Sequence, residues 1–136
     1  MAPTTDLKEL LPWSYPFLMV DRMVHCVPHV SAVTCKQVTA GEAGDGGFPS
    51  VLILEGLSQT AALLFRLSYG PEALAGAPLL GYLKAKFRNR AQPGDTLLYT
   101  VTAIKMTSRR GVFTGVARVG GTKIAATELA FGVSAP

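Results

Sequence analysis

The sequence predicts an α+β fold, in which one long apolar helix packs against a mostly antiparallel sheet of about six strands. The first observation is a run of good helix formers over residues 48–69, with apolar side chains pointing in nearly every direction around the axis. The second is a series of four strand-like segments after this run, separated by short turn sequences. Two more strand-like segments precede the helix, so we expect a curved sheet wrapped around it.

Length and composition predict a single domain over residues 1–136, because 49% of the 136 residues are hydrophobic and can form a sizeable core. The formal charge of +4 is too small to indicate nucleic-acid binding, although it suits an acidic partner. No signal-peptide pattern opens the sequence, and Glu55 and Arg66 interrupt its longest apolar stretch. We therefore expect a cytoplasmic protein without a membrane span.

The segments before the helix are expected in this order. Residues 6–11 form a short helical turn that a proline stops, and residues 12–16 form a stiff, proline-bracketed turn. Residues 17–20 are continuously apolar, which predicts a strand buried on both faces, and residues 30–39 predict the next strand. The glycine-rich residues 40–47 form a loop and lack the spacing of a nucleotide-binding motif.

The helix itself is expected to begin with Ser50 as its N-cap and to end at Gly70. Glu55 is the first candidate for chemistry, because a carboxyl on an enclosed helix needs a partner or a task. At about 100° per residue it shares a stripe of small and polar residues that is typical of a narrow substrate channel. That stripe contains Glu55, Ser58, Gln59, Ala62 and Arg66. Alternatively, Glu55 only complements the positive end of the helix dipole.

After the helix, residues 71–76 form a connecting loop, and residues 79–91, 95–105, 111–119 and 122–133 form the four later strands. Alternation along residues 79–91 puts apolar side chains on the face toward the helix and a row of cations on the other face. The cationic row is Lys84, Lys86, Arg88 and Arg90. Such a row is either a solvated strand face or a docking surface for an acidic partner.

No metal site or other cofactor is expected. Cys26 and Cys35 form no CxxC pair, and His25 and His29 are not spaced with them as metal ligands are.

Three motifs in order then resemble those of the FabZ/FabA-type 3-hydroxyacyl-ACP dehydratases. Residues 11–22 (LPWSYPFLMVDR) resemble the opening LPHRYPFLLVDR, and residues 49–59 (PSVLILEGLSQ) resemble PGVLIIEAMAQ. Residues 84–90 (KAKFRNR) and 92–95 (QPGD) resemble KLRFRQP and PGD. The resemblance covers most of the chain. It implies a hot-dog fold, with a long helix gripped by an antiparallel sheet and acyl tunnels at a dimer interface.

The resemblance also implies that Glu55 is the catalytic acid and that a histidine in a GHFP loop of the facing subunit is the base. Here the sequence departs from the pattern, because residues 41–48 contain no histidine and the loop is shorter. Its nearest remnant is Gly46-Gly47-Phe48-Pro49, and Trp13 replaces the histidine of the opening motif. The homodimer is therefore expected to be a poor dehydratase, since losing an acid or base costs about 10²–10⁴-fold in rate.

Three interpretations remain open from the sequence. The chain is a dehydratase-like subunit that pairs with a histidine-bearing relative, a thioesterase that uses Glu55, or an acyl-binding protein without catalysis. Each implies an acyl carrier protein or coenzyme A thioester as partner and a homodimer or heterodimer. Besides the catalytic candidate Glu55, the candidate substrate-binding residues are Phe48, Ser50, Val51 and Gln59. Backbone N–H groups at the helix start are placed to hold a thioester carbonyl.

Overall fold

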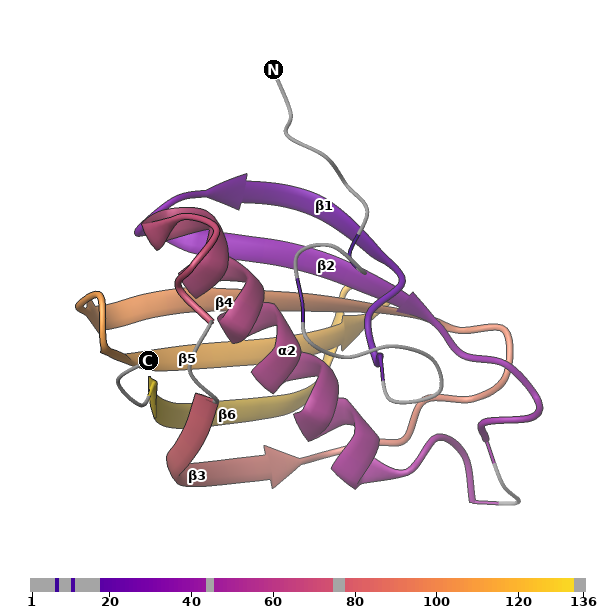
Figure 1. Cartoon of the computed structure of the whole chain (residues 1–136). Helices are drawn as coiled ribbons and strands as arrows, with labels where there is room; N and C mark the ends of the chain where they lie inside the picture. The colour runs from indigo at the N-terminus through magenta and orange to yellow at the C-terminus, as the bar shows by residue number, and fades with distance from the viewer. Residues whose placement is uncertain (1–6, 8–10, 12–17, 44–45, 75–77, 134–136) are drawn as a thin grey trace.

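The computed structural model describes Leu7, Leu11 and residues 18–43, 46–74 and 78–133. These residues form one long helix and one six-stranded sheet in the order β1-β2-β4-β5-β6-β3, with every pair antiparallel. Helix α2 (Ser50–Tyr69) lies across one face of the curved sheet (Figure 1). The strands are β1 (Arg22–Val27), β2 (Ser31–Gln37), β3 (Pro78–Phe87), β4 (Thr96–Met106), β5 (Arg110–Val119) and β6 (Thr122–Val133). The predicted α+β hot-dog architecture is confirmed.

The first strand is not where the sequence predicted it. Residues 18–20 form no strand, although Met19 and Val20 are buried. The backbone N–H of Met19 donates instead to the side-chain oxygen Oε1 of Gln59 at 2.6 Å, so an amide on the helix replaces a sheet partner. Strand β1 comes immediately afterwards and forms one edge of the sheet, where most of its side chains are exposed. Here the run of apolar residues correctly indicated that Met19 and Val20 are buried, but it did not indicate a strand.

The other sheet edge is β3, which ends at Phe87 rather than at residue 91. The apolar side chains of β3 were predicted to pack on the helix. Leu83 does pack against the core, but Ala85 is exposed and Phe87 is 39% exposed. Leu79 and Leu80 are 63% and 56% exposed, because β6 covers only one side of β3. Of the three side chains predicted to pack on the helix, only Leu83 packs against the core, because β3 is the edge strand of the sheet.

Both ends of helix α2 are defined by backbone conformation and backbone hydrogen bonds, without side-chain caps. The residue before its first turn is Pro49, with no side-chain cap, so Ser50 is the first helical residue and not the N-cap. At the other end Gly70 has φ = 93°, and its N–H donates to the carbonyl of Arg66 at 3.0 Å. The left-handed conformation favours glycine, which confirms the predicted helix end.

The core lies between α2 and the inward face of the sheet. Ile53, Leu57 and Leu64 of the helix are fully buried, as are Tyr99 and Phe113 of the sheet. In the part of the chain that the structure describes, α2 alone is long and apolar enough to span a membrane, and 56% of its apolar window is buried inside the fold.

Within the predicted turn at residues 6–11, the structure describes only Leu7 and Leu11, and the N–H of Leu11 donates to the carbonyl of Leu7 at 2.9 Å. The stiff turn predicted for residues 12–16 lies outside the described residues.

Candidate active site

Glu55 lies in the second turn of α2 and is half-buried. Its carboxylate oxygen Oε1 accepts a hydrogen bond from the amide nitrogen Nε2 of Gln59 at 3.2 Å, one helical turn further on. The Gln59 side chain has no exposed surface, and its oxygen Oε1 accepts the Met19 N–H. The structure therefore connects two candidate site residues, Glu55 and Gln59, and attaches both to the segment that precedes β1.

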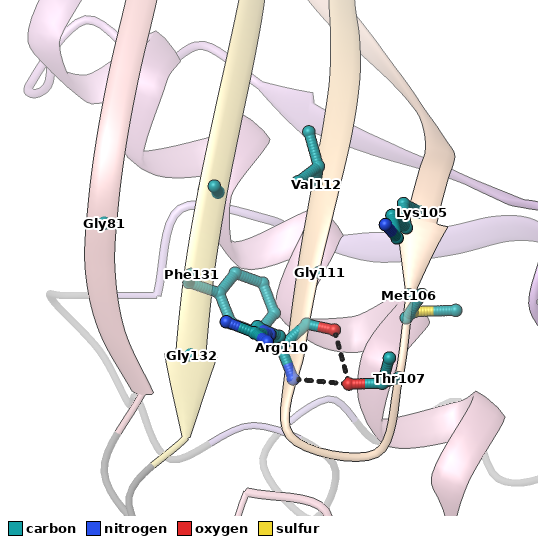
Figure 2. A pocket seen from close by; sticks show the side chains of 10 residues that line it. Gly81, Lys105, Met106, Thr107, Arg110, Gly111, Val112, Phe131 and Gly132 are labelled. Atoms are coloured by element: carbon teal, nitrogen blue, oxygen red, sulfur yellow. Dashed lines mark hydrogen bonds between the residues drawn. The ribbon is translucent and has the colours of Figure 1, made fainter.

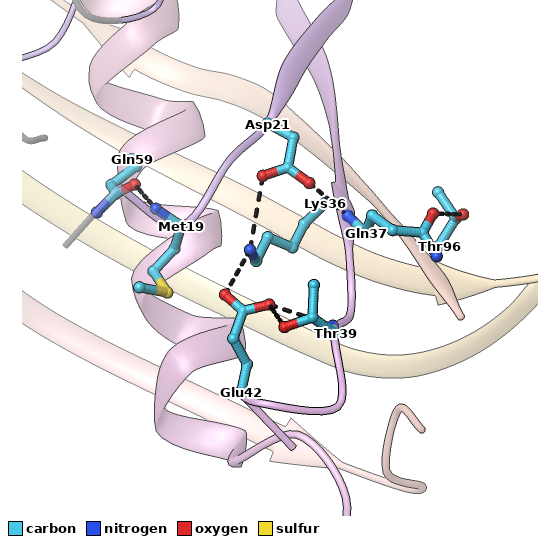
Figure 3. Close-up of polar contacts among 8 residues, drawn as sticks. All are labelled: Met19, Asp21, Lys36, Gln37, Thr39, Glu42, Gln59 and Thr96. Atoms are coloured by element: carbon cyan, nitrogen blue, oxygen red, sulfur yellow. Dashed lines mark hydrogen bonds and ion pairs between the residues drawn. The ribbon is translucent and has the colours of Figure 1, made fainter. Parts of the chain in front are cut away.

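A second polar cluster fastens the glycine-rich loop to β2 (Figure 3). The Nζ of Lys36, a residue only 5% exposed, lies 2.6 Å from Oε2 of Glu42 and 3.5 Å from Oδ1 of Asp21. The second oxygen of Glu42 accepts hydrogen bonds from the N–H and hydroxyl of Thr39. Burial acts to raise the pKa of Glu42, but the Lys36 and Thr39 hydrogen bonds and the Lys36 charge together hold that pKa below its ordinary value. Sequence reasoning missed this cluster, because Glu42 lies in the loop after β2 and meets Lys36 only where that loop turns back toward the strand.

The start of α2 presents three of the predicted substrate-binding residues in different environments. Phe48 is fully buried in the core, and its N–H donates to the carbonyl of Ala91 at 2.7 Å. Ser50 is half-buried and Val51 is 67% exposed. Their N–H groups belong to the first turn, which has no helical carbonyl to bind. The N–H groups of Ser50 and Val51 can thus donate to a bound carbonyl, whereas the side chain of Phe48 packs in the core.

Tyr99 of β4 packs beside Gly56 of α2, and the sequence did not predict a role for it. Its side chain is fully buried, and its hydroxyl has no hydrogen-bond partner among the described residues. Burial raises its pKa far above the ordinary value, and the charges of Asp21 and Glu42 add to this effect. The hydroxyl therefore stays protonated.

Both histidines of the chain lie away from Glu55. His29 sits in the turn between β1 and β2 with φ = 68°, and its ring packs edge-on against Tyr69 with centroids 4.9 Å apart. Tyr69 is the last helical residue, roughly 20 Å along the axis from Glu55 at about 1.5 Å per residue. His25 is exposed on the edge strand β1. Neither imidazole is positioned to act with Glu55 in one chain.

The predicted cationic row divides into two parts. Lys84 and Lys86 are exposed on β3, opposite Glu128 and Ala126 of β6, whereas Arg88 and Arg90 follow the end of the strand. All four are exposed. The row therefore exists as a surface, but only its first half follows the strand alternation from which it was predicted.

A hollow of about 560 Å³ lies at the β4–β5 hairpin and the adjoining ends of β3 and β6 (Figure 2). Its lining combines small residues such as Gly81 and Ala130 with two cations, Lys105 and Arg110. The carbonyl of Met106, in the same lining, accepts a hydrogen bond from the hydroxyl of Tyr69 at the C-terminal end of α2. The hollow is thus at the opposite end of the helix from Glu55.

No group of three or more His, Cys, Asp or Glu side chains able to hold a metal ion occurs within residues 18–43, 46–74 and 78–133 or at Leu7 and Leu11.

Comparison with known proteins identifies the family. The FabA-like domain matches residues 11–128. The chain belongs to the FabA-like family. It is 38% identical to the 3-hydroxyacyl-[acyl-carrier-protein] dehydratase FabZ of Enterococcus faecalis over 135 residues, covering 93% of this chain and 94% of the relative. It is 40% identical to the FabZ dehydratase of an Anaeromyxobacter strain, covering 90% and 84% of the two chains.

Solved structures with low sequence identity share the fold of this FabA-like chain. A chain of the dehydratase heterocomplex ApeI:P from Xenorhabdus doucetiae superposes with a TM-score of 0.81 at 13% identity, covering 98% of this chain and 93% of that one. A hypothetical thioesterase with coenzyme A from Streptococcus pneumoniae superposes with a TM-score of 0.68 at 10% identity, covering 82% and 84%. The same architecture thus occurs in proteins described as dehydratases and as thioesterases.

Proposed function

We propose that this FabA-like chain is a dehydratase-type lyase subunit that handles 3-hydroxyacyl thioesters of an acyl carrier protein in fatty-acid or polyketide assembly. It supplies Glu55 as the acid and works with a related hot-dog subunit that supplies a histidine. The family membership supports the substrate class, because the relatives are named as 3-hydroxyacyl-ACP dehydratases. Coenzyme A is the alternative carrier, and the site needs no cofactor.

The observation that carries the proposal is the separation of Glu55 from both histidines of its own chain. Dehydration needs a base for the proton on C2 and an acid for the departing hydroxyl on C3. Glu55 can serve as that acid, and the N–H groups of Ser50 and Val51 can hold the thioester carbonyl. His29 packs against Tyr69 at the far end of α2, so the base comes from another subunit.

The exposed apolar surface supports a dimeric arrangement. Leu79 and Leu80 are exposed on the edge strand β3, and Val51 is exposed on α2. A second hot-dog subunit would cover such an edge by pairing a strand with it. A structural neighbour is itself described as a dehydratase heterocomplex, which favours a related partner over a second copy.

The carrier protein is proposed to dock on the cationic row of Lys84, Lys86, Arg88 and Arg90, since acidic carriers match an exposed basic surface. The whole chain acts as one domain in this proposal. We place it in the cytoplasm, because α2 packs on the sheet as a core helix and its relatives are named as enzymes of acyl-carrier substrates.

Thioester hydrolysis is the second candidate. A carboxylate beside helix N–H groups can act as base or nucleophile on a thioester without a histidine. The fold is shared with a hypothetical thioesterase that was solved with coenzyme A. Acyl binding without turnover is the remaining outcome.

The experiment assays the chain alone and mixed with a histidine-bearing hot-dog subunit. Two reactions are followed on 3-hydroxyacyl thioesters, namely reversible dehydration and release of free thiol. Each is repeated with Glu55→Gln, which is nearly isosteric and should keep the fold. Dehydration that requires both subunits and is lost by at least 10²-fold in the variant supports the proposal.

The other outcomes each contradict it. Thiol release by the chain alone, abolished by Glu55→Gln, establishes the thioesterase instead. Dehydration by the chain alone removes the need for a partner histidine. Absence of both activities, or full activity of Glu55→Gln, leaves acyl binding as the function, which a fluorescent acyl-probe titration then measures.

A further inference from the structure

The side chain of Gln59 is the most conformationally restricted polar group of the candidate site. It has no exposed surface, and both ends of its amide are engaged, with Oε1 2.6 Å from the Met19 nitrogen and Nε2 3.2 Å from Oε1 of Glu55 (Figure 3 shows the first contact). A backbone N–H can only donate, so the amide oxygen must face Met19. The orientation of the amide is therefore fixed by chemistry, and its nitrogen must face Glu55.

We propose that Gln59 is a positioning residue for Glu55, and not a substrate contact. It holds one carboxylate oxygen of Glu55, Oε1, and leaves the other oxygen for the reacting group. This inference rests on the proposed catalytic role of Glu55. Its own amide does not contact the substrate, because the side chain has no exposed surface and its oxygen and nitrogen are already paired with Met19 and Glu55.

The physical reason is conformational. A glutamate has three rotatable side-chain bonds, and ordering them costs conformational entropy. A donor that is itself immobilised places the carboxylate before the substrate arrives, so this entropy is not lost during the reaction. The Met19 N–H supplies the immobilisation, which makes the backbone before β1 a part of the site although it carries no reacting group.

A purely structural role makes a different prediction. If Gln59 only fills space and satisfies the Met19 N–H, its replacement lowers the melting temperature and leaves the turnover of the folded protein unchanged. If it positions Glu55, replacement lowers kcat while KM stays nearly constant, because the acyl chain and the thioester carbonyl are bound by other groups. Measuring kcat and KM separately therefore distinguishes the positioning role from the purely structural one.

The test uses Gln59→Met, which keeps the length of the side chain and removes the amide. The matched control is Thr60→Val, which removes another fully buried polar group of α2. The hydroxyl of Thr60 hydrogen-bonds the hydroxyl of Thr34 at 2.7 Å and the carbonyl of Gly56 at 2.8 Å, and neither partner is Glu55. Both variants are assayed in the subunit mixture, or alone if the chain acts alone, and their melting temperatures are compared. Gln59→Asn, whose shorter amide cannot span both partners, replaces Gln59→Met if that variant does not fold.

We expect Gln59→Met to lower kcat by about 10–100-fold with KM within about threefold, and Thr60→Val to retain kcat. A second readout needs no turnover. In protein labelled with ¹³C-glutamate, the carboxyl resonance that disappears in Glu55→Gln should shift in Gln59→Met and stay in place in Thr60→Val.

Unchanged kcat together with an unshifted Glu55 resonance overturns the positioning role. Equal losses of kcat in Gln59→Met and Thr60→Val also overturn it, since general loosening of α2 then explains both. If Glu55→Gln itself is fully active, the proposed function fails first, whereas inactive Glu55→Gln with active Gln59→Met refutes only the role of Gln59.

Discussion

A methyl group on Gly56 would lie 2.5 Å from the ring carbon Cζ of Tyr99 and 2.6 Å from its hydroxyl oxygen. The two residues thus fit together only because one of them lacks a side chain. In the motif that residues 49–59 resemble, alanine occupies the position of Gly56. The methyl group of such an alanine has no room here, because the ring of Tyr99 occupies the space beside Gly56, the residue after Glu55.

Gly56→Ala should destabilise the fold by about 1–3 kcal/mol, because Tyr99 is fully buried and cannot move aside. Tyr99→Leu leaves room for the new methyl group, so the double variant should recover part of the loss. Urea unfolding of the four proteins measures the coupling. Additive effects of the two substitutions would show that the residues do not contact each other as described.

Tyr99→Phe should stabilise the protein by about 1 kcal/mol, since it removes a buried hydroxyl that has no hydrogen-bond partner among the described residues. The aromatic ring, which fills most of the space beside Gly56, is kept. Denaturant titration at neutral pH measures the difference. A loss of stability instead would mean that a bound water or a residue outside the described ranges satisfies the hydroxyl.

Glu42→Gln should lower stability at neutral pH by about 1–3 kcal/mol, because it leaves the buried ammonium of Lys36 without its closest carboxylate. The folded-state pKa of Glu42 lies below the ordinary value of 4.5, so its stabilisation is present above that pH and lost as pH falls through the folded-state pKa. The variant should therefore lose less stability than the wild type between about pH 5 and pH 3. Parallel acid-unfolding curves for the two proteins would contradict this ion pair.

Charge reversal at Lys84 and Lys86 should weaken binding of an acidic acyl carrier protein and flatten its dependence on salt. Both side chains are exposed on β3, so the fold should tolerate the change. Calorimetric titration at two salt concentrations gives the result. Reversal at Lys105, near the end of β4 and outside the cationic row, is the matched control, and equal effects at both places would indicate only a general charge effect.

A dimer is expected in solution at micromolar concentration, as a homodimer when the chain is alone and as a heterodimer when its partner is present. The exposed edge β3 needs a covering strand, which one related subunit provides. Light scattering coupled to size exclusion measures the mass. A monomer mass in both samples would refute the shared site.

Much of the fold could be predicted, because periodicity identifies strands that have one buried face. Strands β2, β4, β5 and β6 alternate in this way and were located almost to the residue. The edges were harder, since Arg22–Val27 has neither alternation nor strong hydropathy, and the apolar residues Met19 and Val20 are buried without forming a strand. Burial of a short apolar run does not determine its backbone conformation when a side chain such as Gln59 satisfies its N–H.

The site was predictable only where it coincides with the helix repeat. Glu55 and Gln59 are one turn apart, so their contact follows from the spacing. The Lys36–Glu42 pair and the contact between Gly56 and Tyr99 depend on how a loop and a strand fold back onto β2 and α2. Such contacts come from the tertiary structure and leave no periodic signal in the sequence.

The edge strand β3 also determines how the protein must be produced. A subunit that keeps Leu79 and Leu80 in water beside unpaired backbone groups offers a template to any nascent strand, and its newly made copies are prone to aggregate. Chains whose β3 edge finds neither a second copy nor a related subunit should therefore accumulate in inclusion bodies and be degraded by cellular proteases. Translation of both subunits from one transcript would bring the covering strand to β3 during folding, so the soluble yield should depend on the supply of the partner.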